Sequence, residues 1–84
     1  MDEPTIRRQM RAFILNELMR EPDYPLREDE GIVSSGLMDS FALAELGVFV
    51  EDAFDVYIPD TDLTVAKMDS LNQMVTRVLR DLNS

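Results

Sequence analysis

Apolar residues recur at intervals of three and four in three separate segments of this 84-residue chain. That spacing gathers them on one face of a helix, and no segment shows the alternation of a half-buried strand. A chain of this length forms one domain with one small core. The pattern therefore predicts an all-α bundle of three main helices and one short helix, in a single domain over residues 1–84. The apolar stripes are Ile6, Met10, Phe13, Ile14 and Leu18; Leu43, Leu46, Val50 and Phe54; and Leu71, Met74, Val75, Val78, Leu79 and Leu82.

The first predicted helix runs from Thr5, its expected N-cap, to Met19, and Pro22 with Pro25 ends it. A long connection follows, over residues 21–38. An unstructured loop of that length is uncommon, so we expect its apolar side chains to be pinned onto the core. Those side chains are Leu26, Ile32, Val33 and Leu37.

The second main helix is predicted from Ser40 to about Phe54, with Asp39 as its N-cap. The last helix is expected to begin after Asp69 or Ser70, either of which is suited to cap it, and to end near Leu82. Both helices have the length and the apolar stripe needed to bury one face.

The short helix is predicted over Thr61 to Lys67. Just before it, the run Asp60-Thr61-Asp62 offers carboxylates that a calcium site would use. The run lacks the glycine and the closing glutamate of an EF-hand loop, so the sequence does not favour calcium binding.

Three residue types are missing, and their absence excludes several kinds of chemistry. The chain has no cysteine, histidine or tryptophan. Disulfides, zinc sites with Cys or His ligands and Ser-His or Cys-His catalysis are therefore excluded. No apolar run approaches the roughly 20 residues of a membrane span, and the acidic N-terminus is unlike a secretory signal. We expect a cytoplasmic protein.

Charge is distributed unevenly along the chain, whose formal net charge is −9. From Glu28 to Ala66 there are ten acidic residues and no Lys or Arg, whereas the flanking segments carry all eight cationic residues. Such a chain repels phosphate backbones, so nucleic acid is not an expected partner. The acidic segment favours proteins with basic patches, although acids also serve simply to keep a small domain in solution.

One serine stands out at the start of the second predicted helix, in the string Gly36-Leu37-Met38-Asp39-Ser40-Phe41. A serine that follows a capping aspartate is ordinary helix-start chemistry. The string is not the Gly-x-Ser-x-Gly elbow of a hydrolase, and the chain lacks the histidine base that such a nucleophile needs.

The wider pattern resembles the acyl carrier protein family, including its aminoacyl and peptidyl members. The resemblance covers about residues 26–82. It is carried by Gly36-Leu37-Met38-Asp39-Ser40-Phe41, Glu45-Leu46, Phe54-Asp55 and Ile58-Pro59-Asp60. It implies a small helical bundle that catalyses nothing itself and carries acyl or aminoacyl groups between enzymes.

The resemblance also implies a cofactor and its site. Ser40 would receive 4′-phosphopantetheine from coenzyme A through a phosphopantetheinyl transferase, and the arm would hold its cargo as a thioester. Asp39 would cap the helix and help to arrange the metal ion that the transferase uses; the chain would hold no metal of its own. The other partners would be an acyl- or aminoacyl-loading ligase and downstream acyl-transfer enzymes.

Two further sets of residues follow from the resemblance and the predicted helix faces. The first is a partner-recognition face in which exposed apolar residues stand among acids: Phe41, Ala44, Glu45, Val48, Glu51 and Asp52. The second matches the cleft in which some carriers shelter their cargo, although the sequence favours plain core for its members: Leu46, Gly47, Val50, Phe54, Ile58, Met68 and Leu71. Gly47 either leaves room for a cargo chain or lets the short helix approach.

Departures from the fatty-acid carriers point toward a specialised or aminoacyl carrier. Phe41 replaces the leucine common after the serine, and the stretch between Ile58 and Leu71 is about two residues longer. We expect a discrete, monomeric carrier. The alternative is an acidic helical adaptor that binds a basic protein and is never modified, and only the carrier reading needs the Ser40 hydroxyl.

Overall fold

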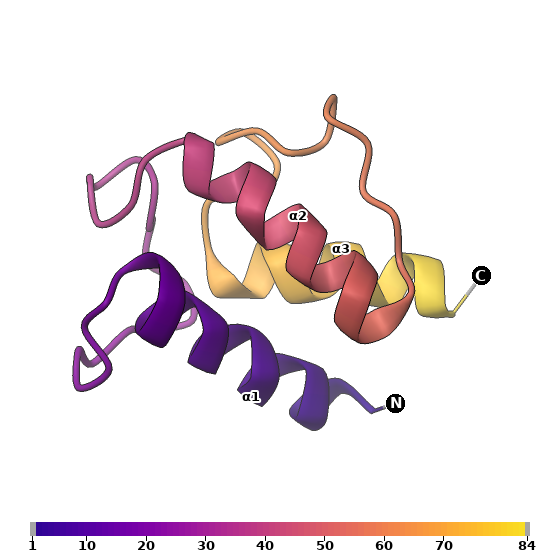
Figure 1. Ribbon diagram of the computed structural model, residues 1–84, viewed down its shortest axis with the longest axis horizontal. Coiled ribbons are helices and arrows are strands. Elements are labelled where there is room, and N and C mark those ends of the chain that lie inside the picture. The colour runs from indigo at the N-terminus through magenta and orange to yellow at the C-terminus, as the bar shows by residue number, and fades with distance from the viewer. Residues whose placement is uncertain (1, 84) are drawn as a thin grey trace.

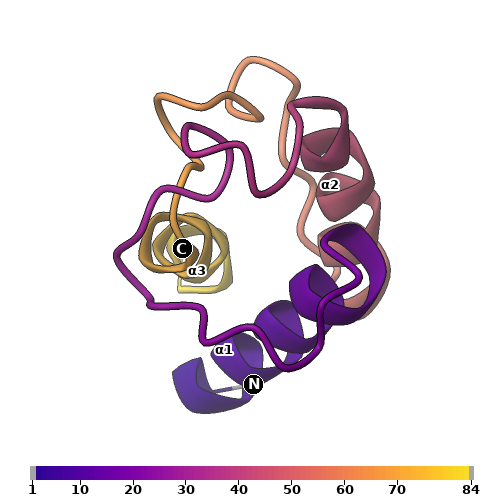
Figure 2. The same ribbon diagram turned by 90° about the vertical axis from the view of Figure 1, so that its left-hand side faces the viewer.

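The computed structural model describes residues 2–83 and contains three α-helices that surround one core (Figures 1 and 2). Helix α1 spans Glu3–Phe13, α2 spans Phe41–Phe54 and α3 spans Leu71–Leu82. A π-helical turn, η1, continues α1 over Ile14–Leu18. No strand occurs among the described residues, so the predicted all-α class is confirmed.

Helix α1 begins two residues earlier than predicted. The Asp2 carboxylate accepts a hydrogen bond of 3.0 Å from the Thr5 amide, which makes Asp2 the N-cap and places Pro4 in the first turn. The prediction that Thr5 caps this helix was therefore wrong. Proline suits the first turn because it has no amide to leave unpaired there, and this allows the helix to start before it.

The end of the first helical segment agrees with the prediction. In η1 the Met19 amide donates to the Ile14 carbonyl at 2.7 Å, a wider turn than that of an α-helix. Arg20 then adopts a left-handed conformation, with a φ of 58°, and the chain leaves the helix before Pro22. The two segments together match the predicted helix to within about two residues.

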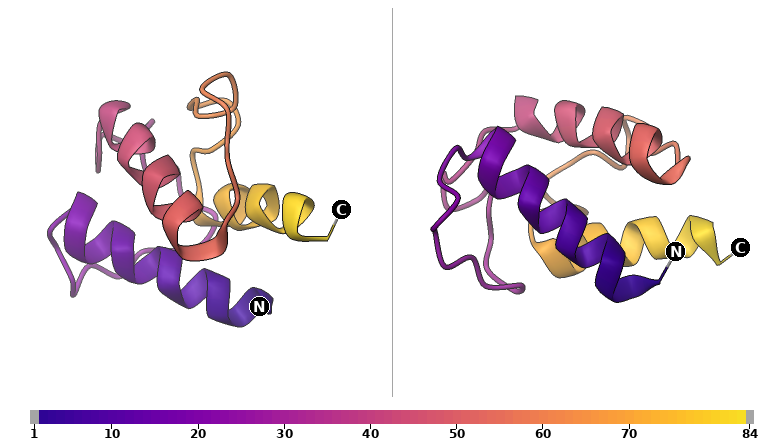
Figure 3. Two further views of the ribbon diagram at one scale, coloured as in Figure 1. Left: turned by 45° about the vertical axis from the view of Figure 1, so that its right-hand side comes forward. Right: turned by 60° about the horizontal axis from the view of Figure 1, so that its bottom comes forward.

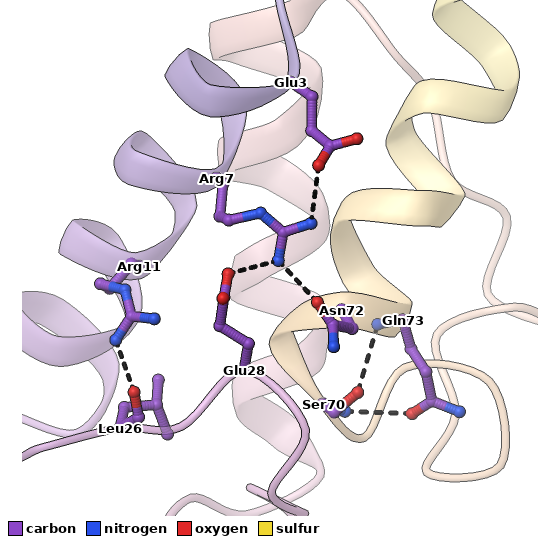
Figure 4. Close-up of polar contacts among 8 residues, drawn as sticks. All are labelled: Glu3, Arg7, Arg11, Leu26, Glu28, Ser70, Asn72 and Gln73. Atoms are coloured by element: carbon purple, nitrogen blue, oxygen red, sulfur yellow. Dashed lines mark hydrogen bonds and ion pairs between the residues drawn. The ribbon is translucent and has the colours of Figure 1, made fainter.

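Helix α3 is capped by Ser70, one of the two predicted candidates. The Ser70 hydroxyl oxygen accepts from the Gln73 amide at 3.2 Å, and the Gln73 side chain accepts from the Ser70 amide at 3.0 Å (Figure 4). This reciprocal pair is a capping box, which satisfies two amides that have no partner within the helix. Asp69 is thereby left to bind elsewhere.

The predicted short helix over residues 61–67 does not form. The chain makes two successive turns instead, closed by hydrogen bonds from Leu63 to Asp60 and from Met68 to Thr64. Two causes account for this. A helix of seven residues is too short to be stable by itself, and three of these seven, Thr61, Thr64 and Val65, are β-branched.

The core is built from the predicted apolar stripes, and α1 packs against α3. Most stripe residues are buried, while Phe13, Leu18 and Leu79 are half-buried at the edge and Leu82 is exposed. Leu26 and Ile32 of the first connection are buried too, and Val33 and Leu37 pack against the core, as predicted.

One arginine joins three parts of the bundle on the α1 side. Arg7 of α1 donates hydrogen bonds to Glu28 of the connection and Asn72 of α3, each at 2.6 Å, and to Glu3 at 3.1 Å (Figure 4). One turn further along, Arg11 donates to the Leu26 carbonyl. The first connection is therefore fixed to α1 before it reaches the start of α2.

Candidate functional site

The chain reaches Ser40 through a closed turn that is anchored at Ile32. The amides of Leu37 and Met38 both donate to the Ile32 carbonyl, at 3.0 and 3.2 Å. Gly36 allows this reversal with a φ of 86°, a left-handed conformation that residues with a Cβ rarely adopt. Ile32 itself is fully buried, so the turn that precedes Ser40 is attached to the core.

Asp69 ties the same turn to the beginning of α3. One of its carboxylate oxygens accepts from the amides of Val33 and Ser34, and the other accepts from the Ser34 hydroxyl at 2.6 Å. Burial acts to raise the pKa of Asp69, but the hydrogen bonds from Ser34, Val33 and Ile32 together lower it below its ordinary value. Local patterns do not reveal this role, because Asp69 and Val33 are 36 positions apart.

Ser40 stands at the N-terminus of α2 with its side chain exposed. The Asp39 carboxylate caps the helix by accepting from the Ala42 amide at 3.0 Å, as predicted. Ser40 has helical backbone angles, and within the described part of the chain its hydroxyl makes no hydrogen bond. Asp39 thus provides the capping hydrogen bond at the start of α2, and the Ser40 hydroxyl remains accessible.

The predicted recognition face lies on the outer side of α2. All six of its residues are exposed, and the two large apolar ones are strongly so, Phe41 at 81% and Val48 at 61%. Glu45, Glu51 and Asp52 surround them. The nearby Tyr57, which the sequence analysis did not single out, extends this apolar surface beyond the end of α2 at 64% exposure.

Net negative charge is concentrated in one part of the molecule, as it is in the sequence. The basic-free segment 28–66 forms most of the upper half of the molecule in Figures 1 and 2, whereas α1 and α3, with most of the cationic residues, form the lower half. Ser40 and the exposed face of α2 belong to the acidic half.

The predicted cargo-cleft residues come from α2, α3 and the second connection (residues 55–70, between α2 and α3), but all seven are buried. Only Gly47 and Ile58 reach a hollow, of about 210 Å³, between α2 and residues 57–63. The side chain of Leu63 packs directly over Gly47 there. Sequence reasoning passed over Leu63, although a glycine in mid-helix signalled that something approaches closely.

A second hollow, of about 520 Å³, lies where the end of α1 meets α2. Its floor includes the stacked rings of Phe13 and Phe49, whose centroids are 4.2 Å apart, and its rim carries Glu45 and Asp52. Phe49 makes a further edge contact with Phe54. This hollow adjoins the recognition face and was not predicted.

Asp62 is used for ion pairing in the second connection. Its oxygens lie 2.8 Å from Lys67 and 3.0 Å from Arg77 of α3, and the side chains of Asp62 and Arg77 are only 15% and 10% exposed. The hydrogen bond from Lys67 lowers the pKa of Asp62; burial opposes that effect, and Arg77 adds to it. A carboxylate held by two cations is not disposed to bind calcium.

Two comparisons with known proteins add to this geometry. The chain is 35% identical over 65 residues to a D-alanyl carrier protein of Lactobacillus helveticus (strain DPC 4571), covering 77% of this chain and 81% of the relative. It is 34% identical, with the same coverage, to a D-alanyl carrier protein of Lactobacillus acidophilus (strain ATCC 700396 / NCK56 / N2 / NCFM). No family model matches the chain.

The fold is that of a small helical carrier domain. With relatives at this level of identity and coverage, the chain belongs to the acyl carrier protein family. Carriers are acted on by enzymes and are not enzymes themselves. Among residues 2–83, no helix is long and apolar enough to cross a membrane.

Proposed function

We propose that this protein is an aminoacyl carrier whose 4′-phosphopantetheine arm is attached to Ser40. The observation that carries the proposal is the Ser40 hydroxyl, which is exposed and without a hydrogen bond at the start of α2 while Asp39 caps the helix. A modification at this oxygen costs the fold no capping bond.

The surroundings of Ser40 fit a phosphodiester. The first turn of α2 contains no acidic residue, and the positive end of the helix dipole lies there. In the transfer step the Ser40 oxygen bonds to phosphorus, the pyrophosphate bond of coenzyme A breaks, the nucleotide half leaves and the hydroxyl proton passes to the transferase. When bound, the arm supplies a thiol that holds the cargo as a thioester. Asp39 would also help to arrange the transferase's metal ion, by family analogy.

D-Alanine is the cargo that we infer, because both relatives are named D-alanyl carrier proteins. The partners would then be a phosphopantetheinyl transferase, an amino-acid-activating ligase and an enzyme that accepts the aminoacyl group. We propose that the protein meets them as a monomer in the cytoplasm.

The direct test is intact mass before and after incubation with coenzyme A, magnesium and a broad-specificity phosphopantetheinyl transferase. We expect the native chain to gain one phosphopantetheine and Ser40→Ala to gain none while keeping its fold. Ser35→Ala is the matched control, since it removes a nearby exposed hydroxyl and should leave loading unchanged. A native chain that no transferase modifies, and that carries no arm already, would favour the unmodified acidic adaptor.

Cargo identity is tested on the modified protein with a D-alanine-activating ligase and ATP. We expect D-alanine to load as a thioester that neutral hydroxylamine removes, and L-alanine to load poorly with that ligase. If neither amino acid is loaded onto a protein that carries the arm, the D-alanyl assignment is contradicted. The attachment of the arm at Ser40 is not affected by that result.

We further propose that the outer face of α2 receives these partners. Phe41 and Val48 would bury against the partner, and Glu45 and Glu51 would attract its basic residues. Charge reversal at Glu45 and Glu51 should slow transfer of the arm, and more so at low salt, where the attraction reaches furthest. Reversal at Asp23, an exposed acid of the first connection, is the control. If charge reversal leaves the rate of arm transfer unchanged at all salt concentrations, Glu45 and Glu51 do not belong to the recognition face.

A further inference from the structure

Gly47 has no side chain and so leaves a gap on the surface of α2, which the side chain of Leu63 fills. If Gly47 carried a Cβ, that atom would lie 3.0 Å from one methyl carbon of Leu63 and 3.5 Å from the other. The shorter distance is closer than ordinary van der Waals contact allows. Leu63 therefore sits deeper against α2 than it would over any other residue.

The turn that carries Leu63 is also fixed by its own hydrogen bonds. Its amide donates to Asp60 at 3.1 Å, and the preceding amide, of Asp62, donates to Pro59 at 2.9 Å. The Asp62 carboxylate is in turn anchored to Arg77 of α3. The position of Leu63 is thus fixed by a turn and by an adjacent ion pair, as well as by contact with Gly47.

Behind Leu63 the core is closed. The side chains that a cargo chain would have to pass are at most 3% exposed, and they are Leu46, Val50, Ile58, Met68 and Leu71. In front of it, the shallow hollow between α2 and residues 57–63 is bordered by the carboxylates of Glu51 and Asp60. An alkyl chain would find an acidic rim there and then the methyl groups of Leu63. Figure 3 shows this connection rising beside α2 before it returns to α3.

We propose that Leu63 is a specificity-determining residue that closes the space between α2 and the second connection to cargo. The inference rests on the proposed carrier function and deepens it. With Leu63 in place, the cargo class is one that remains outside in solvent, such as a short polar aminoacyl group, and long alkyl chains gain no shelter. Shortening Leu63 opens a recess above Gly47 that an alkyl chain can enter.

The test compares acetyl and octanoyl thioesters on Ser40, both installed by a transferase from the matching coenzyme A thioesters. Cleavage by neutral hydroxylamine is followed by intact mass. In the native protein we expect both thioesters to be cleaved at the same rate. In Leu63→Ala the octanoyl thioester should be cleaved about tenfold more slowly, the factor expected from sheltering roughly two methylene groups, while the acetyl rate stays unchanged.

Three further variants distinguish a recess above Gly47 from a general loosening of the fold. Leu63→Val should give a smaller retardation and serves as the deciding variant if circular dichroism shows that Leu63→Ala does not fold. Val65→Ala shortens an exposed apolar side chain of the same connection and should leave both rates alone. Gly47→Ala added to Leu63→Ala refills the recess and should restore rapid octanoyl cleavage.

The outcomes distinguish this inference from the function on which it rests. A chain that gains no mass at Ser40 contradicts the carrier function itself. A loaded native protein that already retards octanoyl cleavage overturns the role of Leu63. Folded Leu63 variants that cleave the two thioesters at equal rates overturn it as well.

Discussion

Residues 19–40 and residues 55–70 both cross from one helix to the next, but they are anchored by different kinds of contact. The first connection is held mostly through its backbone: the Leu26 carbonyl accepts from Arg11, and the amides of Val33 and Ser34 donate to Asp69 of the second connection, while Glu28 adds an ion pair with Arg7. The second is held through a side chain, by ion pairs between Asp62 and the cations Lys67 and Arg77. Each connection also buries apolar residues.

Because of this difference, the two connections should respond differently to salt. Ser40 ends the first connection, where Asp69 accepts hydrogen bonds from neutral amides and a hydroxyl, and salt weakens such bonds little. Leu63 lies in the second, beside an ion pair that salt weakens. The proposed attachment point, Ser40, thus adjoins the better-fixed connection, and Leu63 lies in the more adjustable one.

The largest effect is expected for Asp69→Ala. It leaves the amides of Val33 and Ser34 without their acceptor, and hydrogen bonds to a charged group contribute about 2 kcal/mol. We expect urea denaturation to show a loss of about that size in the free energy of unfolding. Ser34→Ala removes only the hydroxyl donor and should cost less. An Asp69→Ala protein as stable as the native one would show that the first connection has other, sufficient anchors.

Acid should weaken both connections together. The pKa values of Asp69 and Asp62 lie below the ordinary 3.8, so each carboxylate binds its proton more weakly in the folded state than in the unfolded state. Their stabilisation is complete above that value and is lost as the pH falls through the lowered pKa. Denaturation from pH 5 to about pH 2 should show this fall, and Asp69→Asn and Asp62→Asn should each flatten it. A slope that neither substitution changes would place the acid-sensitive groups elsewhere.

Salt should weaken the ion pairs of Asp62 more than the hydrogen bonds of Asp69, and this is the smallest effect. Asp62→Asn removes the carboxylate that Lys67 and Arg77 contact, and the resulting destabilisation should shrink as sodium chloride is added, because the native ion pairs are screened. The cost of Asp69→Ala should not change with salt. Equal salt dependence of the two variants would abolish the distinction between the connections.

Helix positions were predictable because each helix carries its own apolar stripe, and the burial of Ile6, Leu46 and Met74 follows from spacing alone. The N-cap of α1 was predicted at the wrong residue because Asp2 and Thr5 both suit a helix start. Which of the two caps the helix depends on where the backbone first becomes helical. The predicted short helix failed where local propensity is weak and two turns replace it.

The candidate site also combines local features, which were predictable, with contacts between distant residues, which were not. Asp39 and Ser40 were predictable, since a cap and the residue after it are local features. The contacts of Asp69 with Ser34 and of Leu63 with Gly47 join residues that are distant in sequence, so no periodicity reveals them. Gly47 signalled a close approach, but only the fold shows that Leu63 makes it.

The concentration of net negative charge in one half of the molecule gives it an electric dipole in addition to its net charge of −9. A positively charged partner exerts a torque on such a dipole and turns the α2 side toward itself before any contact is made. Orientation is then selected during diffusion. Because salt shortens the range of that field, raising the ionic strength lowers the fraction of encounters that arrive with Ser40 facing the partner, as well as their number.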